Sequence, residues 1–415
     1  MKSKTLLLAA LALCAGSAAA QAPDFARGAD ISWCTEMEAQ YYNFYNSAGK
    51  KTDIFSLMQS IGMNSIRLRV WVNPETAYGD WCDKDDVVAK AVRANELGLS
   101  VMIDFHYSDF FADPSRQTKP SDWSDYSVSE LTQAVTDHTT DVLQALDSAG
   151  VEPVWVQVGN ETNNGMLWDD TSDYGYLWIN SSSYGVWDNY VAFSNAGYEA
   201  VKAVFPDAIV IVHLADAYKD YAWWWKRFSA AGGKFDMIGV SHYPDLTGTY
   251  YADYATGNSL ACSYVEAVAE TYGVKAMIVE TAVSPDDEET AAAAMSDLFT
   301  KVRATSNIIG IFYWEPEVYN YWKPSYYSTL GWSAWDKGAF YSSGNSAGAH
   351  YGSPMTTLSA FTEDAETYDA IESVTASASD TQKAYYNLSG QRVSDSSTGL
   401  LIERSGNTAR KILKK

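Results

Sequence analysis

The stretch DDVVAKAVRANELGLSVMIDFHYS, residues 85–108, decides the fold. Its first part, to Gly98, places apolar residues at helical spacing behind two acids and predicts an amphipathic helix that ends at a glycine. Its second part, from Val101, is an apolar run of strand length that ends with the polar residues Asp104 and His106. Such a run is typical of a parallel strand buried on both faces. The stretch therefore predicts one helix-strand unit of an α/β fold.

The same pattern recurs along the chain, and helical patterns such as residues 137–150 separate most of the apolar runs. The expected strands are GADISW (28–33), SIRLRVW (65–71), VMIDFHYS (101–108), VWVQVGNE (154–161), AIVIVHLA (208–215), MIGVSHY (237–243), AMIVETA (276–282) and IIGIFYWE (308–315). Eight strands alternating with helices predict a (β/α)8 TIM barrel, although an open doubly wound sheet would show the same alternation.

Polar side chains gather where these runs end, and a barrel carries its active site at that face. They are Arg69, Asp104, His106, Asn160, Glu161, His213, His242, Glu280 and Glu315. Strands that only build a core do not need polar residues at their ends. Their presence here therefore favours the barrel. No glycine-rich phosphate fingerprint follows any of the runs, and this argues against a nucleotide or dinucleotide enzyme.

Charge and aromatic content narrow the classes of molecule that the protein can bind. A formal net charge of -23 argues against nucleic acid and anionic membranes, because both demand a cationic face. Aromatic residues make up 14% of the chain, and such rings stack on sugars as well as filling cores. A neutral substrate therefore fits better, and the aromatic content leans toward a polysaccharide. We also expect a monomeric protein.

The N-terminus has the pattern of a secretory signal. Lysines precede an apolar run and the small residues 17–20, which predicts cleavage near Ala20 and a secreted, periplasmic or cell-surface protein. A lipoprotein signal at Cys14 is less favoured, because a large leucine precedes it. The apolar run is too short to span a bilayer, and we expect no membrane span.

The barrel pattern covers residues 21–362, and a stretch rich in Ser, Thr, Ala and Asp at 363–383 predicts a linker. The tail, residues 384–415, holds three short strand-like runs with turns between them. It resembles the C-terminal modules of many Bacteroidetes secreted proteins. The resemblance implies a sorting signal for type IX secretion, with a small β appendage as the equal alternative.

Three cysteines remain after the expected cleavage site: Cys34, Cys82 and Cys262. Three cannot build a disulfide framework, and a chain of this size does not need one for its core. At most one pair forms, and the sequence leaves open whether Cys34 and Cys82 pair.

Glu161 and Glu280 close the fourth and seventh expected strands. These strands lie across a barrel from each other, so both carboxylates would point into its mouth. Glycoside hydrolysis needs one carboxyl group that protonates the leaving oxygen and one that attacks or stabilises the anomeric carbon, and a separation of about 5 to 5.5 Å gives retention. The pair therefore predicts a glycosidase, although strand-end glutamates can also be caps or partners of cations.

The order of the motifs resembles glycoside hydrolase family 53, the endo-β-1,4-galactanases of clan A. The matching runs cover nearly the whole barrel, and they are GADISW, NSIRLRVWVNP, MIDFHYSDFFADPSRQTKPSDW, WVQVGNETNNGMLW, VIVHLADA, IGVSHYP and IVET, of which FHYSDFFADP is the most specific. The resemblance implies a secreted retaining endo-glycosidase that cuts β-1,4-galactosidic bonds in galactan or type I arabinogalactan side chains of pectin. It also implies Glu161 as the acid/base and Glu280 as the nucleophile.

The resemblance further implies substrate contacts. Asn160 would bind the C2 hydroxyl of the sugar in the −1 subsite, and His106 and Tyr243 would line that subsite, with the Tyr243 hydroxyl on Glu280. His242 is predicted to bind substrate too, with a hydrogen-bonded core histidine as an equal alternative. An aromatic residue at the end of the last strand suits a stacked sugar, and Trp314 is the expected −1 platform.

An arginine on the second strand is expected beneath the nucleophile, where it would lower the pKa of Glu280 and keep it anionic. We expect this arginine to be Arg69, because Arg67 lies deeper from the end of the strand. Glu161 needs a raised pKa before it can donate a proton, and ionised Glu280 supplies part of that rise.

No catalytic metal or cofactor is predicted, since the H-x-H of metal-dependent barrels and the H-E-x-x-H motif are missing. The acidic run SPDDEE (284–289) is typical of a helix N-terminus capped by Ser284. Some family members bind calcium near the barrel mouth, so calcium stays open without assigned ligands. The alternatives are another clan A endo-hydrolase such as a mannanase or cellulase, a glycan-binding barrel without catalysis, and a metal-dependent barrel hydrolase.

Overall fold

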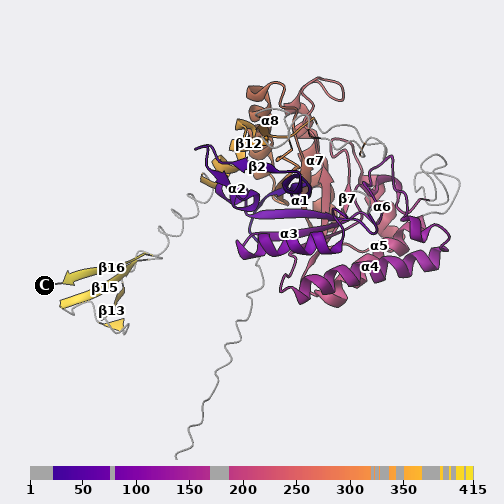
Figure 1. Ribbon diagram of the computed structural model, residues 1–415, viewed down its shortest axis with the longest axis horizontal. Helices are drawn as coiled ribbons and strands as arrows, with labels where there is room; N and C mark the ends of the chain where they lie inside the picture. Colours follow the sequence, from indigo (N-terminus) through magenta and orange to yellow (C-terminus); the bar gives the residue numbers. More distant parts are fainter. Residues whose placement is uncertain are drawn as a thin grey trace, which may run out of the picture.

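Eight parallel strands close into a barrel in the computed structural model (Figure 1), in the order β1-β10-β9-β8-β7-β6-β5-β4. The structure describes residues 22–74, 80–168, 187–318, Trp322, Tyr327, 336–342 and 350–366, and the tail strands within 384–414. The barrel strands are β1 (Ala26–Asp30), β4 (Ser65–Val70), β5 (Ser100–Phe105), β6 (Trp155–Val158), β7 (Ile209–Leu214), β8 (Met237–Ser241), β9 (Lys275–Thr281) and β10 (Ile308–Trp314). The predicted TIM barrel is therefore confirmed, and each of the eight expected strands is present.

Helices connect the strands and cover the outside of the barrel (Figure 1). They are α1 (Cys34–Ala39), α2 (Ile54–Ser60), α3 (Lys84–Glu96), α4 (Val128–Ser148), α5 (Trp187–Val204), α6 (Ala222–Ala230), α7 (Tyr254–Tyr272) and α8 (Glu288–Arg303), with 3-10 turns η2 (Ser121–Trp123), η3 (Thr162–Asn164) and η4 (Thr356–Leu358). Ser127 and Glu130 form a capping box at the start of α4. The N-cap of α8 is Asp287, which accepts a hydrogen bond from the Thr290 amide, so the prediction of Ser284 as this cap was wrong.

The barrel interior is layered, because side chains on each strand alternate between inside and outside. The lowest layers are an apolar plug of Ala26, Met102, Val154, Trp155, Ile211, Met237, Met277, Val279 and Phe312. Phe312 fills the space beside Gly28, where a Cβ atom would lie 2.2 Å from its ring. Above the plug, the next inward positions are polar, such as Asp104 after Met102 on β5 and His213 after Ile211 on β7. The apolar plug thus supports a polar layer at the C-terminal mouth.

Two smaller sheets accompany the barrel. One has the order β11-β12-β2-β3 and is made of β2 (Tyr42–Tyr45), β3 (Lys51–Thr52), β11 (Phe340–Ser342) and β12 (His350–Pro354). The other belongs to the tail, has the order β14-β13-β15-β16 and is made of β13 (Ala384–Tyr386), β14 (Arg392–Val393), β15 (Gly399–Ser405) and β16 (Thr408–Lys414).

The packed region continues slightly beyond residue 362, the expected end of the barrel. Residues 359–366 are helical, and the buried Asp364 forms ion pairs with Arg27 at 3.3 Å and Arg303 at 2.5 Å. Residues 363–366, which were expected to begin the linker, therefore belong to this helix, and the rest of the expected linker lies outside the described residues.

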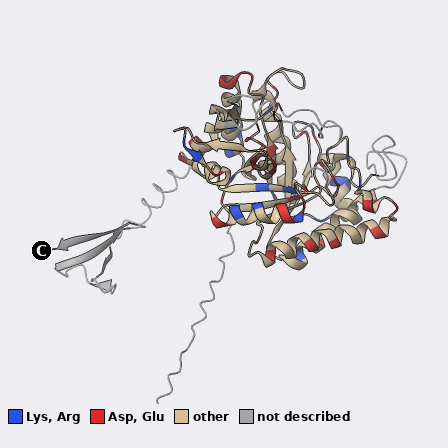
Figure 2. Ribbon diagram, in the orientation of Figure 1, with Lys and Arg blue, Asp and Glu red and all other residues tan. Residues whose placement is uncertain are grey.

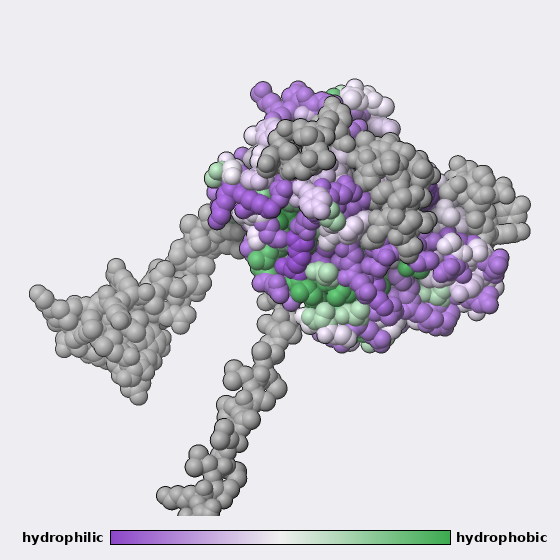
Figure 3. Space-filling view, in the orientation of Figure 1, coloured by the Kyte–Doolittle hydropathy of each residue, from purple (hydrophilic) through white to green (hydrophobic). Residues whose placement is uncertain are grey.

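Charged residues mark the outside of the barrel. Asp and Glu residues lie along α4 (Figure 2), and most of the described surface on the viewed face is hydrophilic (Figure 3). In the described residues, no helix is long and apolar enough to cross a membrane.

Candidate active site

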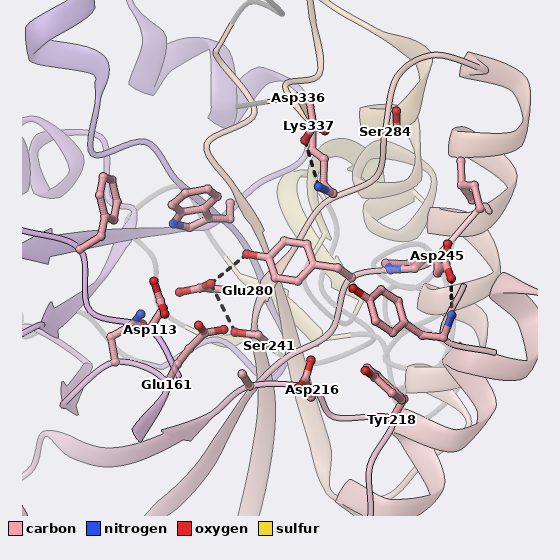
Figure 4. Close-up of a pocket in the computed structure, with 18 of the residues that line it drawn as sticks. Asp113, Glu161, Asp216, Tyr218, Ser241, Asp245, Glu280, Ser284, Asp336 and Lys337 are labelled. Carbon is pink, nitrogen blue, oxygen red and sulfur yellow. Dashed lines mark hydrogen bonds and ion pairs between the residues drawn. The ribbon is translucent and has the colours of Figure 1, made fainter. Parts of the chain in front are cut away.

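A cleft of about 660 Å³ opens at the C-terminal mouth of the barrel. Residues from the ends of six strands, β5 to β10, or from the loops after them line it, and Glu161 and Glu280 point into the same space (Figure 4). Among the lining residues are His106, Phe111, Asp113, Asn160, Glu161, Asp216, Tyr218, Ser241, Tyr243, Asp245, Tyr250, Glu280, Asp286, Trp314, Asp336 and Lys337. The structure thus brings the two predicted catalytic carboxylates together in one cleft.

Glu161 follows β6 in a left-handed backbone conformation, with φ 49°. Gly159 just before it also has a positive φ, of 96°, so the chain turns sharply between the strand and η3. Non-glycine residues rarely adopt this conformation, and those that do are enriched at functional sites. The turn places the partly exposed Glu161 side chain in the cleft. Burial and the negative charge of Glu280 raise the pKa of Glu161 well above its ordinary value.

Glu280 lies near the end of β9 and is 5% exposed. Its Oε1 lies 2.8 Å from Nη2 of Arg67, while its Oε2 accepts hydrogen bonds from the Tyr243 hydroxyl at 2.9 Å and the Ser241 hydroxyl at 3.3 Å. Both carboxylate oxygens are therefore held, and the predicted contact with Tyr243 is present. Burial raises the pKa of Glu280 although Arg67 and Tyr243 act to lower it, so the expected net lowering was wrong.

Arg67, and not Arg69, is the cation beneath Glu280. Its guanidinium also pairs with Asp30 at 2.7 Å and Asp104 at 2.8 Å. Two further hydrogen bonds run to Gln157 at 2.7 Å and to Asn160 at 2.9 Å. The prediction failed because it judged reach from the depth of the Cα atom, and an arginine side chain is long enough to cross one layer of the barrel.

Arg69 turns toward the end of β10 instead. It forms an ion pair with Glu315, and the rings of Trp33, Trp71 and Phe111 surround its guanidinium at 4.9, 5.2 and 4.7 Å. Such cation–π contacts hold rings in place. Phe111 lines the cleft, so Arg69 supports the cleft wall and does not itself line it.

Asn160 and His106 lie where they were expected, in the wall of the cleft. The Asn160 amide donates to the Ala112 carbonyl at 2.7 Å and accepts from Arg67, which fixes its orientation. His106 Nδ1 accepts from the Ala112 amide at 2.9 Å, so its Nε2 carries the hydrogen that faces Asp104, also at 2.9 Å. The FHYSDFFADP loop therefore orients both side chains.

His242 lies outside the cleft. It is fully buried, and its Nε2 contacts the Asn258 side chain on α7 at 2.8 Å. Burial lowers its pKa to about 4, which leaves the ring neutral. This geometry favours the core histidine over the predicted substrate contact. Trp314, by contrast, lines the cleft and packs against Trp33 with 5.4 Å between ring centroids.

Sequence reasoning did not single out several residues of the cleft. Ser241 bridges the site, since it donates to Glu280 and contacts His213 Nε2 at 2.8 Å. Tyr218 and Tyr250 reach the cleft from loops after β7 and β8. Their positions after strand ends were the available signal, but a tyrosine in a loop is too common to mark a site by itself.

The arrangement suits acid–base and nucleophilic roles. The carboxyl group with the more strongly raised pKa, Glu161, keeps its proton, while Arg67 and Tyr243 hold the charge of Glu280 in place. In the described residues, no group of three or more His, Cys, Asp or Glu is placed to hold a metal ion. The two carboxyl groups themselves could protonate a leaving oxygen and attack a carbon.

Comparison with known proteins agrees with this chemistry. The model of glycosyl hydrolase family 53 matches residues 26–374. The chain belongs to this family.

Curated relatives and solved structures carry consistent names. The family 53 chain is 32% identical over 345 residues to a probable arabinogalactan endo-beta-1,4-galactanase A of Aspergillus fumigatus, covering 76% of this chain and 90% of the relative. It is 31% identical over 372 residues to the arabinogalactan endo-beta-1,4-galactanase of Cellvibrio japonicus, covering 82% and 91%. A fungal beta-1,4-galactanase structure matches with a TM-score of 0.65 at 26% identity, covering 81% of this chain and 98% of the fungal one.

The three cysteines that the structure of this family 53 glycoside hydrolase describes are free thiols. Cys34, Cys82 and Cys262 are all buried and unpaired in the structure. Cys82 Sγ contacts the Ser32 carbonyl at 3.7 Å instead of a second sulfur. The question left open by the sequence, whether Cys34 and Cys82 pair, is thus answered in the negative.

Tyr243→Phe is expected to lower kcat/KM about tenfold, since a hydrogen bond to a charged group is worth about 1.5–3 kcal/mol. The lost bond stabilised ionised Glu280, so its pKa rises further and the acid limb of the pH profile moves to higher pH. The measurement is kcat/KM against pH for both proteins. A tenfold fall with an unmoved acid limb would mean that Tyr243 acts on substrate and not on Glu280.

Proposed function

We propose that this glycoside hydrolase is a retaining endo-β-1,4-galactanase that acts on galactan and on the type I arabinogalactan side chains of pectin. The observation that carries the proposal is the carboxylate pair in one cleft, with Glu280 bound by Arg67, Tyr243 and Ser241. The names of the relatives supply the substrate class. The expected signal up to Ala20 would direct the protein out of the cytoplasm. Plant polysaccharides are found there.

The proposed reaction has two steps. In the first, Glu280 attacks the anomeric carbon while Glu161 gives its proton to the leaving oxygen, which breaks the glycosidic bond and forms a glycosyl ester. Esterification removes the charge of Glu280, and this lowers the pKa of Glu161. In the second step Glu161 takes a proton from water, whose oxygen attacks the anomeric carbon and releases Glu280 as a carboxylate. The sugar keeps its configuration.

Other side chains hold the reacting sugar. Asn160 lies beside Glu161 with its amide fixed by Ala112 and Arg67, and we assign it to the C2 hydroxyl. His106, whose ring is held between the Ala112 amide and Asp104, lies in the same wall, and Trp314 is the apolar floor of the −1 subsite. No metal takes part in this scheme, and a calcium ion elsewhere in the protein would be structural.

The test of the function is release of reducing ends from linear β-1,4-galactan, beside β-1,4-mannan and carboxymethylcellulose. Proton NMR of the first product, before mutarotation, reports its anomer. Cleavage of galactan alone with a β-anomeric product supports the proposal. Cleavage of mannan or cellulose instead would keep the chemistry and replace the substrate, and an α-anomeric product would overturn retention.

We expect the cleft to reject anionic chains. Its lining carries Asp113, Asp216, Asp245, Asp286 and Asp336 besides the catalytic pair. Among the lining residues that the structure describes, Lys337 is the one lysine, and it pairs with Asp336 at 3.0 Å. Like charges repel a uronate chain across such a surface, most strongly at low salt.

Polygalacturonate should therefore not be cut. It should also not inhibit galactan cleavage at mass concentrations up to about ten times the KM for galactan. The measurement is the galactan rate with and without polygalacturonate at low and at physiological salt. Inhibition near the galactan KM at low salt would contradict the role of these carboxylates.

A further inference from the structure

Two tyrosine rings form one wall of the cleft. Tyr218 follows β7 and Tyr250 follows β8, and both line the cleft with ring centroids 5.9 Å apart and planes at 39°. Tyr250 is 69% exposed, which is unusual for so large an aromatic side chain. Burying such a ring against a ligand is favourable. A tyrosine ring with its polar hydroxyl suits a ligand that has both an apolar face and hydrated polar groups.

These rings lie away from Trp314. Around the barrel, β7 and β8 stand between the strand of Glu161, β6, and the strand of Glu280, β9, whereas Trp314 ends β10 beyond Glu280. Figure 4 shows Tyr218 and Asp245 together on one side of the catalytic pair, with Asp113 on the other. A sugar chain that crosses the pair from Trp314 thus arrives at the two tyrosines.

We propose that Tyr218 and Tyr250 form a stacking platform for a neutral pyranose on the leaving-group side of the scissile bond. This inference rests on the proposed function, which puts the attacked sugar on Trp314. The carboxylates of Asp216 and Asp245 line the same end of the cleft and are acceptors for the hydroxyl groups of that sugar. Ring faces and acceptors together suit a neutral sugar and not a uronate.

Hydrogen bonds hold the loop that carries Tyr250 in shape before substrate arrives. The Asp245 carboxylate accepts from the Tyr250 amide at 2.8 Å and from the Thr247 amide at 2.7 Å. The hydroxyl of Tyr251 donates to the Tyr243 carbonyl at 2.8 Å and accepts from the Asp245 amide at 2.7 Å. Preorganisation of this kind lowers the entropy cost of binding.

The same loop connects the platform with the nucleophile. Tyr243, which holds Glu280, starts the loop, and the Tyr251 ring packs against Tyr218 with centroids 5.3 Å apart. Gly257 on α7 makes room for the Tyr251 ring, since a Cβ atom there would lie 2.2 Å from it. One cross-linked loop therefore positions both a catalytic contact and the platform.

The test compares a substrate that fills the leaving-group side with one that leaves it empty. β-Galactobiosyl fluoride leaves that side empty, because its leaving group is a single atom, whereas galactan fills it. Tyr250→Ala should lower kcat/KM about tenfold on galactan and no more than about twofold on the fluoride. Tyr250→Phe keeps the ring and should restore the galactan rate.

Tyr41→Ala is the matched control, since Tyr41 is 76% exposed and does not line the cleft. It should stay within about twofold of the wild type on both substrates. Equal losses for Tyr250→Ala on galactan and fluoride, or no loss on galactan, would overturn the platform. Failure of the wild type on galactan would overturn the proposed function instead, and the same variants would then be compared on oligosaccharides of whichever β-glycan is cut.

Discussion

Glu280→Ala is expected to lose at least about three orders of magnitude in kcat/KM on galactan, the usual share of a nucleophile. The variant should still fold, because Arg67 keeps Asp30 and Asp104 as partners. The deleted carboxylate leaves room for a small anion. Azide should therefore displace nitrophenolate from a nitrophenyl β-galactobioside in this variant and give an α-galactobiosyl azide, detected by NMR.

Glu161→Ala is the matched comparison. Its kcat/KM on galactan should fall by a similar factor, because that leaving group needs a proton. Its kcat/KM on the nitrophenyl substrate should fall far less, because nitrophenolate leaves without one. Azide should here give the β-azide, because Glu280 still forms the ester. If the two variants gave products of the same anomeric form, the assigned roles would be wrong.

Arg67→Met is expected to destabilise the protein by about 3–5 kcal/mol, since it leaves three buried carboxylates without their cation. It should also abolish most activity. Arg67 lowers the pKa of Glu280, so in the variant that pKa rises and the acid limb of kcat/KM moves to higher pH. Thermal unfolding and the pH profile measure the two effects.

Arg69→Met is the matched control, because it removes a buried arginine of the same strand that does not touch Glu280. It should lower stability as well, but the acid limb should stay in place. Arg67→Lys keeps the charge and should restore part of the rate if Arg67→Met proves too unstable to assay. An acid limb that moves with Arg69 and not with Arg67 would contradict the ion pair to Glu280.

Much of this protein could be derived from local patterns. Apolar runs of strand length alternating with helices predict a barrel, because every barrel strand is buried on both faces whatever its neighbours are. Glu161 and Glu280 could be found because strand ends of a barrel converge on one mouth. Asn160 and His106 followed from motifs close to those strand ends.

Contacts that span the barrel could not be derived in this way. The depth of Arg67 on its strand suggested a residue out of reach, yet its flexible side chain crosses a layer toward Asp30, Asp104 and Glu280. His242 lies next to Tyr243 in sequence but turns outward to Asn258, because neighbouring positions at a strand end face opposite sides.

The sequence by itself determined the barrel and the two strand-end glutamates, since these rest on periodicity and on residues adjacent to strand ends, while longer motifs carried the family resemblance. Only the tertiary structure decided which arginine contacts Glu280, which histidine reaches the cleft, and that Tyr218 and Tyr250 meet. Those outcomes depend on side-chain reach and on loops from different strands, and the free energy of such contacts is set by burial and neighbouring charges that no single segment contains.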